Sequence, residues 1–453
     1  MKTVITVKLK LRTTPEQFAA LRVTQLAYRD ALNYVSQYAF AHGKMSNKVK
    51  LQDGTYDEVR ARFHLPSQMA CSVPRQVGAT YKGLWKKVKQ NATARKAGQT
   101  KKRYKGLDKA PKYVSPTLTY QNRKDYTLKK NQQVSVLTLD GRVIVPYTGY
   151  SKHVALIQQG KHKGKGLGAA NLWYDKPHKH FYLLVSLEVE TADPTPQTHT
   201  SVVGVDVGMR YLAVTSDTKG ACSFHTGKRV VPKANHYARL RKRLQKKGTR
   251  SATRQLVAIS GRERRLKADA NHVVSKRIVN RYPNSLIGLE QLTDIRERTK
   301  QQTHTRKKDG QGIERISVKQ RRANATSSKW SFAELQRMIA YKALLQGSMA
   351  IKVDARYTSQ ACPVCGHTAP GNRPKKGLLF VCQNCHYILH ADLVGARNIA
   401  MRTLIARQDW AVTGVLSERP DGSSAEAKAA RLQSYAELRW SLDPSLASFD
   451  RGL

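Results

Sequence analysis

Four of the six cysteines fall into two pairs with the spacing of metal ligands. One pair flanks Pro-Val and the other, sixteen residues further on, flanks Gln-Asn. Four thiolates at this spacing are typical of a closed tetrahedral zinc site, which leaves no position for a catalytic water. Disulfides are the alternative, but paired C-x-x-C sequences in a long chain without a signal peptide favour metal. We therefore predict a structural zinc ion held by Cys362, Cys365, Cys382 and Cys385, with His367, His386 and His390 as bystanders.

Two acidic residues stand at the ends of apolar segments, where a rigid strand could present them to a cation. Asp206 follows the apolar segment 202–205, and a glycine-permitted turn then leads to a second apolar segment, 211–215. Glu290 follows the apolar run 286–289. A charge at the end of a buried strand is uncommon unless the charge is paired or binds metal. Both residues are therefore candidate cation ligands, although Asp206 alone could equally be an aspartate at the mouth of a hairpin.

A third acid, Asp392, opens the segment 392–400, which we expect to be a helix whose first residue points back at the strands. A plain helix cap is the alternative, because Asp favours that position. Asp354 also follows an expected strand, 351–353, and we leave it out of the set. The order of the three acids strengthens the hypothesis that they act together: a strand Asp, a strand Glu, then the cysteine pairs and a helix Asp.

The charge of the chain predicts a polyanionic partner. Lys and Arg total 81 against 31 Asp and Glu, a formal net charge of +50, and one long basic region, 233–281, is expected to be helical. Such a surplus repels itself unless it is neutralised, so nucleic acid is the expected partner. A ribosome-bound or histone-like protein is the alternative, but 40% hydrophobic residues over 453 positions suffice for two or three cored domains. No apolar run of membrane-spanning length is present, and we expect an intracellular protein.

The first hundred residues predict a strand followed by helices. Apolar and polar residues alternate over 5–11, which is typical of a half-buried strand. Thr14 and Pro15 then signal a helix start, and an amphipathic helix is expected near 75–89. The segment 86–112 holds eleven basic residues and one acidic residue. We expect this segment to be a loop, or a region that RNA orders, rather than packed structure.

Strand signals return after this basic segment. Asp140 and Gly141 predict a two-residue hairpin turn. We expect the first strand of the chain to pair with the later ones in a small barrel, with the helices of residues 14–112 inserted into it. Residues 191–200, with two prolines, predict the linker that closes this half. The expected strands are 134–139, 143–145, 172–174 and 181–189.

Taken together, these features resemble the TnpB family, RNA-guided endonucleases that are encoded by insertion sequences and related to compact type V CRISPR effectors. The resemblance is close over residues 200–405. In the amino-terminal half, only the order of the expected elements is similar. The family often has Asn-Ala-Ala where this chain has Val394, Gly395 and Ala396. The matching positions are Gly204–Gly208, Leu289 and Glu290, Trp330–Phe332 with the Leu335 helix, Tyr341–Ala343, Tyr357–Gln360, Cys362–Gly366 and Cys382–Asn398.

The resemblance implies an α/β plus all-β architecture. A RuvC-type nuclease domain of the RNase H fold would be interrupted by the zinc module and preceded by a β-barrel wedge domain with an inserted helical recognition region. The implied ranges are 1–13 and 113–192 for the wedge barrel, 14–112 for the recognition region, 201–360 and 386–410 for the nuclease domain, 361–385 for the zinc module that binds target nucleic acid, and 411–453 for a variable tail.

The resemblance also implies that Asp206, Glu290 and Asp392 form one catalytic site. Three converging carboxylates repel one another, so two divalent ions are needed to keep them ionised together. Mg²⁺ suits ligands that are all oxygen. One ion would activate a water for in-line attack on phosphorus and the other would stabilise the departing 3′ oxygen. We therefore expect a metal-dependent DNA endonuclease that leaves 5′-phosphate and 3′-hydroxyl ends.

The expected function is transposon-encoded, RNA-guided cleavage of double-stranded DNA next to a short adjacent motif. The expected partners are a guide RNA transcribed from the transposon end and the target DNA. We expect a monomer in the prokaryotic cytoplasm, associated with the nucleoid and without a membrane partner. Two alternatives remain open: a compact type V CRISPR effector, and an RNA-guided DNA-binding repressor that does not cleave. The neighbouring DNA would distinguish the first alternative from the transposon-encoded form, because it would contain either a repeat array or transposon ends.

Overall fold

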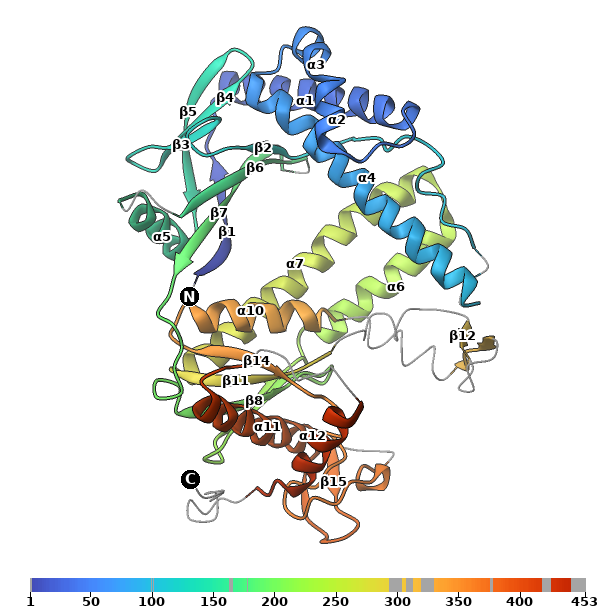
Figure 1. Cartoon of the computed structure of the whole chain (residues 1–453), viewed down its shortest axis with the longest axis vertical. Coiled ribbons are helices and arrows are strands. Elements are labelled where there is room, and N and C mark those ends of the chain that lie inside the picture. The colour runs from blue at the N-terminus through green and yellow to red at the C-terminus, as the bar shows by residue number, and fades with distance from the viewer. Residues whose placement is uncertain are drawn as a thin grey trace. The chain divides into compact units, whose positions relative to one another are not determined.

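The chain divides into two compact units (Figure 1). The N-terminal unit comprises residues 2–190 with a short hairpin of β12 (His304–Arg306) and β13 (Ile313–Arg315), and the C-terminal unit holds the other described residues from 191 onward. None of the described helices combines the length and the apolarity that a membrane span needs. The computed structural model describes residues 2–98, 100, 102–162, 166–176, 178–292, 304–306, 313–318, 330–374, 378–417 and 425–440.

Seven antiparallel strands form the sheet of the N-terminal unit: β1 (Lys2–Leu11), β2 (Leu118–Tyr120), β3 (Tyr126–Leu128), β4 (Gln133–Thr138), β5 (Gly141–Gly149), β6 (Leu167–Asp175) and β7 (His180–Glu190). Their order is β2-β6-β7-β1-β5-β4-β3. The predicted pairing of the first strand is confirmed, because Val7 lies opposite Val185 and Leu11 opposite Tyr147. Tyr126 Oη, on the last strand, donates to the carbonyl of Gly168 on β6. The sheet is therefore rolled into a nearly closed barrel, as the sequence predicts.

Two local features of the barrel differ from the sequence prediction. Thr138 pairs with Gly141, so the turn residues are Leu139 and Asp140, one position earlier than predicted. Gly141 has a φ of +105°, a conformation that glycine adopts without strain, and it can therefore serve as the first residue of β5. An unpredicted helix, α5 (Ser151–His162), connects β5 to β6.

The helices of this unit are α1 (Pro15–Ala41), α2 (Lys48–Asp53), α3 (Tyr56–Phe63) and α4 (Ser67–Lys96). The predicted start of α1 is confirmed by a capping box between Thr14 and Gln17. The loop predicted for 86–112 is wrong in its first part, because α4 continues to Lys96. Lys, Gln, Ala and Arg favour helices and no glycine interrupts them before Gly98, so charge alone did not end the helix.

Residues 191–200 contain no helix or strand and lead into the C-terminal unit, as predicted. Its sheet has the order β10-β9-β8-β11-β14. The central strand β8 runs parallel to β11, and β11 runs parallel to β14, whereas β9 is antiparallel to both β8 and β10. The strands are β8 (Ser201–Asp206), β9 (Tyr211–Asp217), β10 (Cys222–Thr226), β11 (Ser285–Glu290) and β14 (Met349–Val353).

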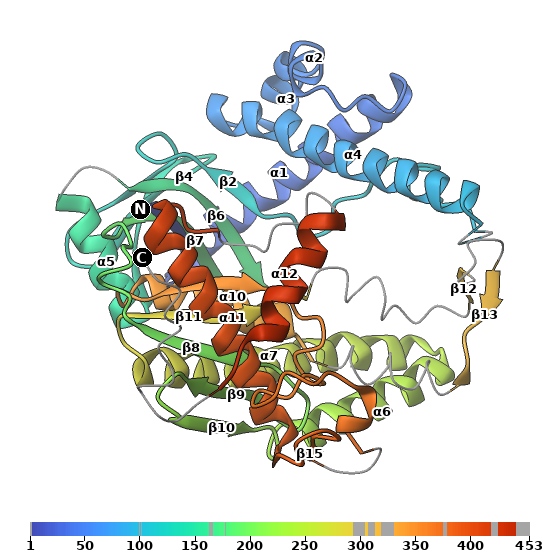
Figure 2. The same cartoon turned by 60° about the horizontal axis from the view of Figure 1, so that its bottom comes forward.

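Helices cover both faces of this sheet. On one face, Ile278 and Leu335 pack with Val203 and Leu289 in a buried cluster. On the other face, Ile399 packs with strand residues that include Leu286, Met349 and Ile351, and Figure 2 shows α11 crossing the strands. The helices are α6 (Val231–Lys247), α7 (Arg250–Arg281), α10 (Phe332–Leu344), α11 (Ala391–Thr413) and α12 (Ala425–Glu437).

Candidate active site and metal centre

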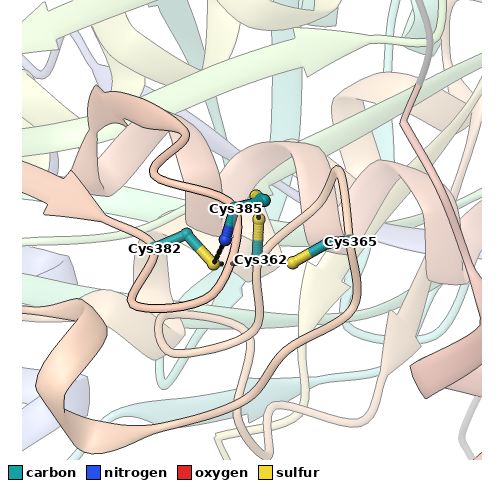
Figure 3. Close-up of side chains that lie close together, drawn as sticks. All are labelled: Cys362, Cys365, Cys382 and Cys385. Carbon is teal, nitrogen blue, oxygen red and sulfur yellow. Dashed lines mark hydrogen bonds between the residues drawn. The ribbon is translucent and has the colours of Figure 1, made fainter.

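The two cysteine pairs meet in one cluster (Figure 3). The Sγ atoms of Cys362 and Cys385 are 3.7 Å apart, and those of Cys365 and Cys382 are 3.5 Å apart. A tetrahedral zinc ion with Zn–S bonds of about 2.3 Å places its sulfurs about 3.8 Å apart, whereas a disulfide needs about 2.05 Å. All four thiols are free. The cluster fits zinc, and it contains none of the three neighbouring histidines.

Hydrogen bonds to sulfur prepare the cluster for a metal. The backbone amides of Asn384 and Cys385 point at the sulfur of Cys382, at 3.4 and 3.5 Å. Burial raises the pKa of Cys362 to about 12. Burial also tends to raise the pKa of Cys365. Hydrogen bonds from the His367 backbone and from the neighbouring thiols outweigh this effect and lower the pKa to about 6. A bound cation would remove this difference in pKa between the two thiols, because metal ligation keeps every coordinating thiol deprotonated.

The cysteine cluster is packed directly onto the helix that carries Asp392. Strand β15 (Leu379–Val381) pairs with β16 (Ile388–His390), and α11 begins at the next residue. Phe380 and Cys382 are buried against Ala391 and Val394 in the first turns of α11. The position of the first turn of α11 is therefore supported by the folded cysteine module.

Asp206 and Glu290 lie at the same ends of neighbouring strands. In the parallel pair β8 and β11, Val205 is opposite Leu289, so the next residues, the two acids, end their strands side by side. Burial raises the pKa of Glu290, and Thr358 and Arg402 oppose this effect. The Glu290 carboxylate accepts a hydrogen bond from Thr358 Oγ1 at 2.8 Å.

Asp392 reaches the same region from α11. The helix begins at Ala391 and its N-cap is His390, whose Nδ1 accepts a hydrogen bond from the Asp392 amide. The prediction that Asp392 is the first helical residue is therefore wrong by one position, and the cap alternative does not apply to it. Its carboxylate lies 3.5 Å from the guanidinium of Arg373 in the cysteine module, and the side chain of Asp392 is 20% exposed.

The electrostatics of Asp206 report that the three acids share one environment. Burial raises the pKa of Asp206 well above its ordinary value, and Glu290 and then Asp392 raise it further, while Arg373 opposes them. Unlike the cysteine sulfurs, the carboxylate oxygens are not all within 4.8 Å of one another. A donor set of carboxylate oxygens suits a hard divalent cation.

Further residues support the carboxylates and were not singled out from the sequence. Gln336 of α10 donates to the backbone carbonyl of Glu290 at 2.8 Å, and Asn398 donates to the carbonyl of Thr358 at 2.7 Å. A Cβ atom on Gly395 would lie 3.1 Å from Cγ of Asp206. Glycine at this departure from the family pattern therefore leaves room for the carboxylate. Thr358 and Asn398 lie within the matching motifs. Their supporting roles become visible only from their hydrogen-bond partners in the structure.

Comparison with known proteins gives two separate family matches. Residues 184–297, which include Asp206 and Glu290, match the family model OrfB_IS605, described as "Probable transposase". Residues 332–399, which include the four cysteines and Asp392, match the "Cas12f1-like, TNB domain". Together the two matches contain every residue predicted for the two sites.

Individual relatives agree with these matches. The chain is 29% identical over 224 residues to the Escherichia coli (strain K12) protein named "Putative RNA-guided DNA endonuclease InsQ", covering 48% of this chain and 53% of that protein. It is 30% identical over 143 residues to the TnpB-like protein MJ0751 of Methanocaldococcus jannaschii, covering 31% of this chain and 44% of that protein. The chain thus spans about half or less of the length of these curated relatives.

Among solved structures, the mini-RNA-guided endonuclease CRISPR-Cas_phi3 matches with a TM-score of 0.48 at 10% identity, covering 89% of this chain and 92% of that chain. This likeness is too weak to define a shared fold. The family matches cover the segments of this chain that carry the acids and the cysteines. By these sequence matches, the chain is similar to TnpB-like and Cas12f1-like proteins over the residues that carry the three acids and the four cysteines.

Proposed function

We propose that the protein is a transposon-encoded, RNA-guided and Mg²⁺-dependent endonuclease that cleaves double-stranded DNA next to a short adjacent motif. Asp206, Glu290 and Asp392 would form its single RuvC-type site. The observation that carries this proposal is the shared environment of the three carboxylates, in which Glu290 and Asp392 both raise the pKa of Asp206. Perturbed carboxylates grouped in this way are more typical of functional sites than of a structural scaffold.

The topology of the C-terminal unit supports a nuclease of the RNase H type. Of the five strands in the order β10-β9-β8-β11-β14, four run in one direction and β9 runs opposite, with the first acid on the central strand and the second on its parallel neighbour. A rigid central strand holds a ligand more precisely than a loop can. The third acid comes from α11, which crosses the same sheet (Figure 2).

The three carboxylates would hold two magnesium ions. When bound, the ions would supply an activated water for in-line attack and stabilise the departing 3′ oxygen, leaving 5′-phosphate and 3′-hydroxyl ends. Thr358 holds one oxygen of Glu290 and so directs its other oxygen. Arg373 partly neutralises Asp392 and Asp206 before a cation is bound. The zinc module would position the first turn of α11 and help to load the target strand.

The proposed partners are a guide RNA transcribed from the transposon end and double-stranded target DNA. The net charge of +50 supports a polyanionic partner. In RNA-guided recognition, base pairing reads the sequence and the protein reads only a short adjacent motif. We expect the protein to act as a monomer in the prokaryotic cytoplasm, at the nucleoid.

A compact type V CRISPR effector is the second candidate, favoured by the match of residues 332–399 to a Cas12f1-like domain. The neighbouring DNA decides between the two, because only a CRISPR effector is encoded beside a repeat array. A guide-directed repressor without cleavage is less well supported, because all three acids are present.

The catalytic assignment is tested by isosteric substitution of the acids. Asp206→Asn, Glu290→Gln and Asp392→Asn should each lower cleavage of both DNA strands by more than the roughly 10- to 100-fold typical of losing a metal's outer-shell partner. Guide-directed DNA binding should persist, and the triple variant should be no worse than the single ones. The readouts are single-turnover cleavage and equilibrium DNA binding.

Asp217→Asn is the matched control, because Asp217 lies on β9 opposite Val203, away from the acidic end of β8. Its carboxylate accepts the amides of Lys219 and Ala221, and an asparagine oxygen can accept them too. This variant should cleave normally. An Asp206→Asn protein that still cuts one strand at the wild-type rate would show a second active site and refute the assignment.

A further inference from the structure

The C-terminal segment 425–440 is packed onto α11. Leu438 and Trp440 are 6% and 8% exposed and form a buried cluster with Ala400 and Met401 of α11. Helix α12, the first part of this segment, has 13 residues, a length that is marginally stable in isolation. The buried contacts with α11 therefore hold the segment in place, within a range that the sequence suggested to be a variable tail.

The same segment also contacts the zinc module. The Trp440 amide donates to the carbonyl of Pro363, between the first two cysteines, at 2.6 Å. The guanidinium of Arg397 lies 4.9 Å from the Trp440 ring, and Arg397 donates to Tyr387 Oη beside the last cysteine. A Cβ atom on Gly366 would meet the carbonyl of Ala436. Segment 425–440 thus joins α11 to the cysteine knuckles.

Tyr435 connects this segment to the carboxylates through Arg402. Arg402 is 4% exposed, and its Cζ atom lies 4.3 Å from the centre of the Tyr435 ring. Arg402 Nη1 donates to the carbonyl of Asp354 at 2.6 Å. Its charge also acts on Glu290, whose pKa it lowers. A buried guanidinium needs compensating contacts, and here a ring face and a carbonyl supply them while Glu290 stays free to accept from Thr358.

We propose that Tyr435 is a positioning residue for the carboxylate site. By covering Arg402, its ring keeps the guanidinium against the Asp354 carbonyl and away from direct pairing with Glu290. Without the ring, Arg402 is free to turn toward the acidic groups that act on it, Asp354 and Glu290. A guanidinium paired with Glu290 competes with a divalent cation for that carboxylate. The consequence for cleavage rests on the proposed function, whereas the consequence for the position of Arg402 does not.

The test compares wild type, Tyr435→Phe and Tyr435→Ala as full-length protein with its copurifying RNA. Tyr435→Ala should raise the Mg²⁺ concentration for half-maximal cleavage about 10-fold, an effect in the range of lost outer-shell partners. Tyr435→Phe keeps the ring and should stay within about 2-fold of wild type. Zinc content and target-DNA binding should be unchanged in both variants, whereas a merely structural role would alter zinc content or melting without a specific change in Mg²⁺ dependence.

A second readout does not depend on cleavage. In protein without magnesium, Tyr435→Ala should increase amide hydrogen exchange in peptides 352–358 and 398–404, and Tyr435→Phe should not. In a double-mutant cycle, Tyr435→Ala and Arg402→Lys should be non-additive, because both act on one contact.

Wild-type Mg²⁺ dependence in Tyr435→Ala, or equal damage from Phe and Ala, would overturn the proposal. A wild-type protein that never cleaves would contradict the proposed function instead, and the exchange experiment would still decide the role of Tyr435.

Discussion

Asp206 is held in an environment that opposes its own charge. It lies at the end of a buried strand, and Glu290 and Asp392 add to the effect of burial by raising its pKa. A group kept in this state destabilises the folded protein at neutral pH unless a cation compensates. The cost is consistent with a site that binds a divalent cation.

This cost can be measured as pH-dependent stability. The pKa of Asp206 is higher in the folded than in the unfolded state, so the folded state binds the proton more tightly. Stability is then greatest at low pH and falls as pH rises from the unfolded-state pKa through the folded-state pKa. In magnesium-free buffer, Asp206→Asn should therefore melt above wild type near pH 8, and the difference should vanish near about pH 4.

Magnesium should reverse this ranking near pH 8. Binding to the folded state raises the melting temperature of wild type, and the variant, which has lost a charged ligand, should respond weakly. Wild type that is the more stable protein without magnesium would contradict the raised pKa of Asp206.

Among the elements, α11 has the largest role in assembling the site. It starts at the zinc module, carries Asp392 and crosses the sheet above two glycines, Gly204 of β8 and Gly288 of β11, which are register partners. A Cβ atom on Gly204 would clash with the backbone of Ala396 and Ala400, and one on Gly288 would clash with the side chain of Thr403. The glycine pair therefore sets how closely α11 approaches the two strands that carry the other acids.

Gly204→Ala should thus destabilise the C-terminal unit by about 1–3 kcal/mol or more, because an added methyl group here meets backbone rather than a flexible side chain. Cleavage should fall with it, since α11 carries Asp392. Gly83→Ala in α4 is the control: no atom lies within 4 Å of its added Cβ, and it should be neutral or stabilising by up to about 1 kcal/mol. Urea unfolding measures the stability of both variants. A Gly204→Ala protein as stable as wild type would exclude the close approach of α11 to β8.

The zinc module provides the second prediction for an element. Cys382→Ser leaves three thiolates and should release the metal, and the packing of Phe380 and Cys382 on α11 should be lost with it. Cleavage should then weaken while RNA binding persists. Metal analysis should find about one zinc per chain in wild type and in the control Cys71→Ser. Active, freshly reduced protein that contains no zinc would disprove the site.

At the scale of the whole molecule, the excess positive charge dominates. The chain carries a formal charge of +50, far more than the two sites need, and such a charge opposes compaction unless a polyanion neutralises it. The basic segment 86–112 is only partly helical. Its later part contacts α4 through Asn91, whose side chain donates to the carbonyl of Lys102 and accepts from the amide of Tyr104.

The protein should therefore be stable mainly as a ribonucleoprotein. RNA-free protein should be poorly soluble at low salt, and its cognate RNA should raise the melting temperature and protect residues 86–112 from protease. The gain should shrink as salt increases, because counterion release drives the binding. Apoprotein that is equally protected, and that gains no melting temperature with this RNA, would contradict the prediction.

The sequence by itself determined the features that depend on short-range pattern. The spacing of the cysteines predicted a cluster that the fold assembles, and alternation over 5–11 predicted a barrel strand. The apolar segments before Asp206 and Glu290 predicted β8 and β11. These inferences succeeded because residue spacing and hydrophobic period act within a few turns or strands.

Only the tertiary structure decided the contacts between distant residues. Parallel pairing of β8 with β11 brings Asp206 beside Glu290, and the supporting contacts from Gln336, Thr358 and Tyr435 come from elements far along the chain. Local pattern also placed the start of α11 and the end of α4 imprecisely, because caps and helix ends depend on which side chains reach the last free backbone groups. Chain topology and packing set such contacts, and no spacing in the sequence records them.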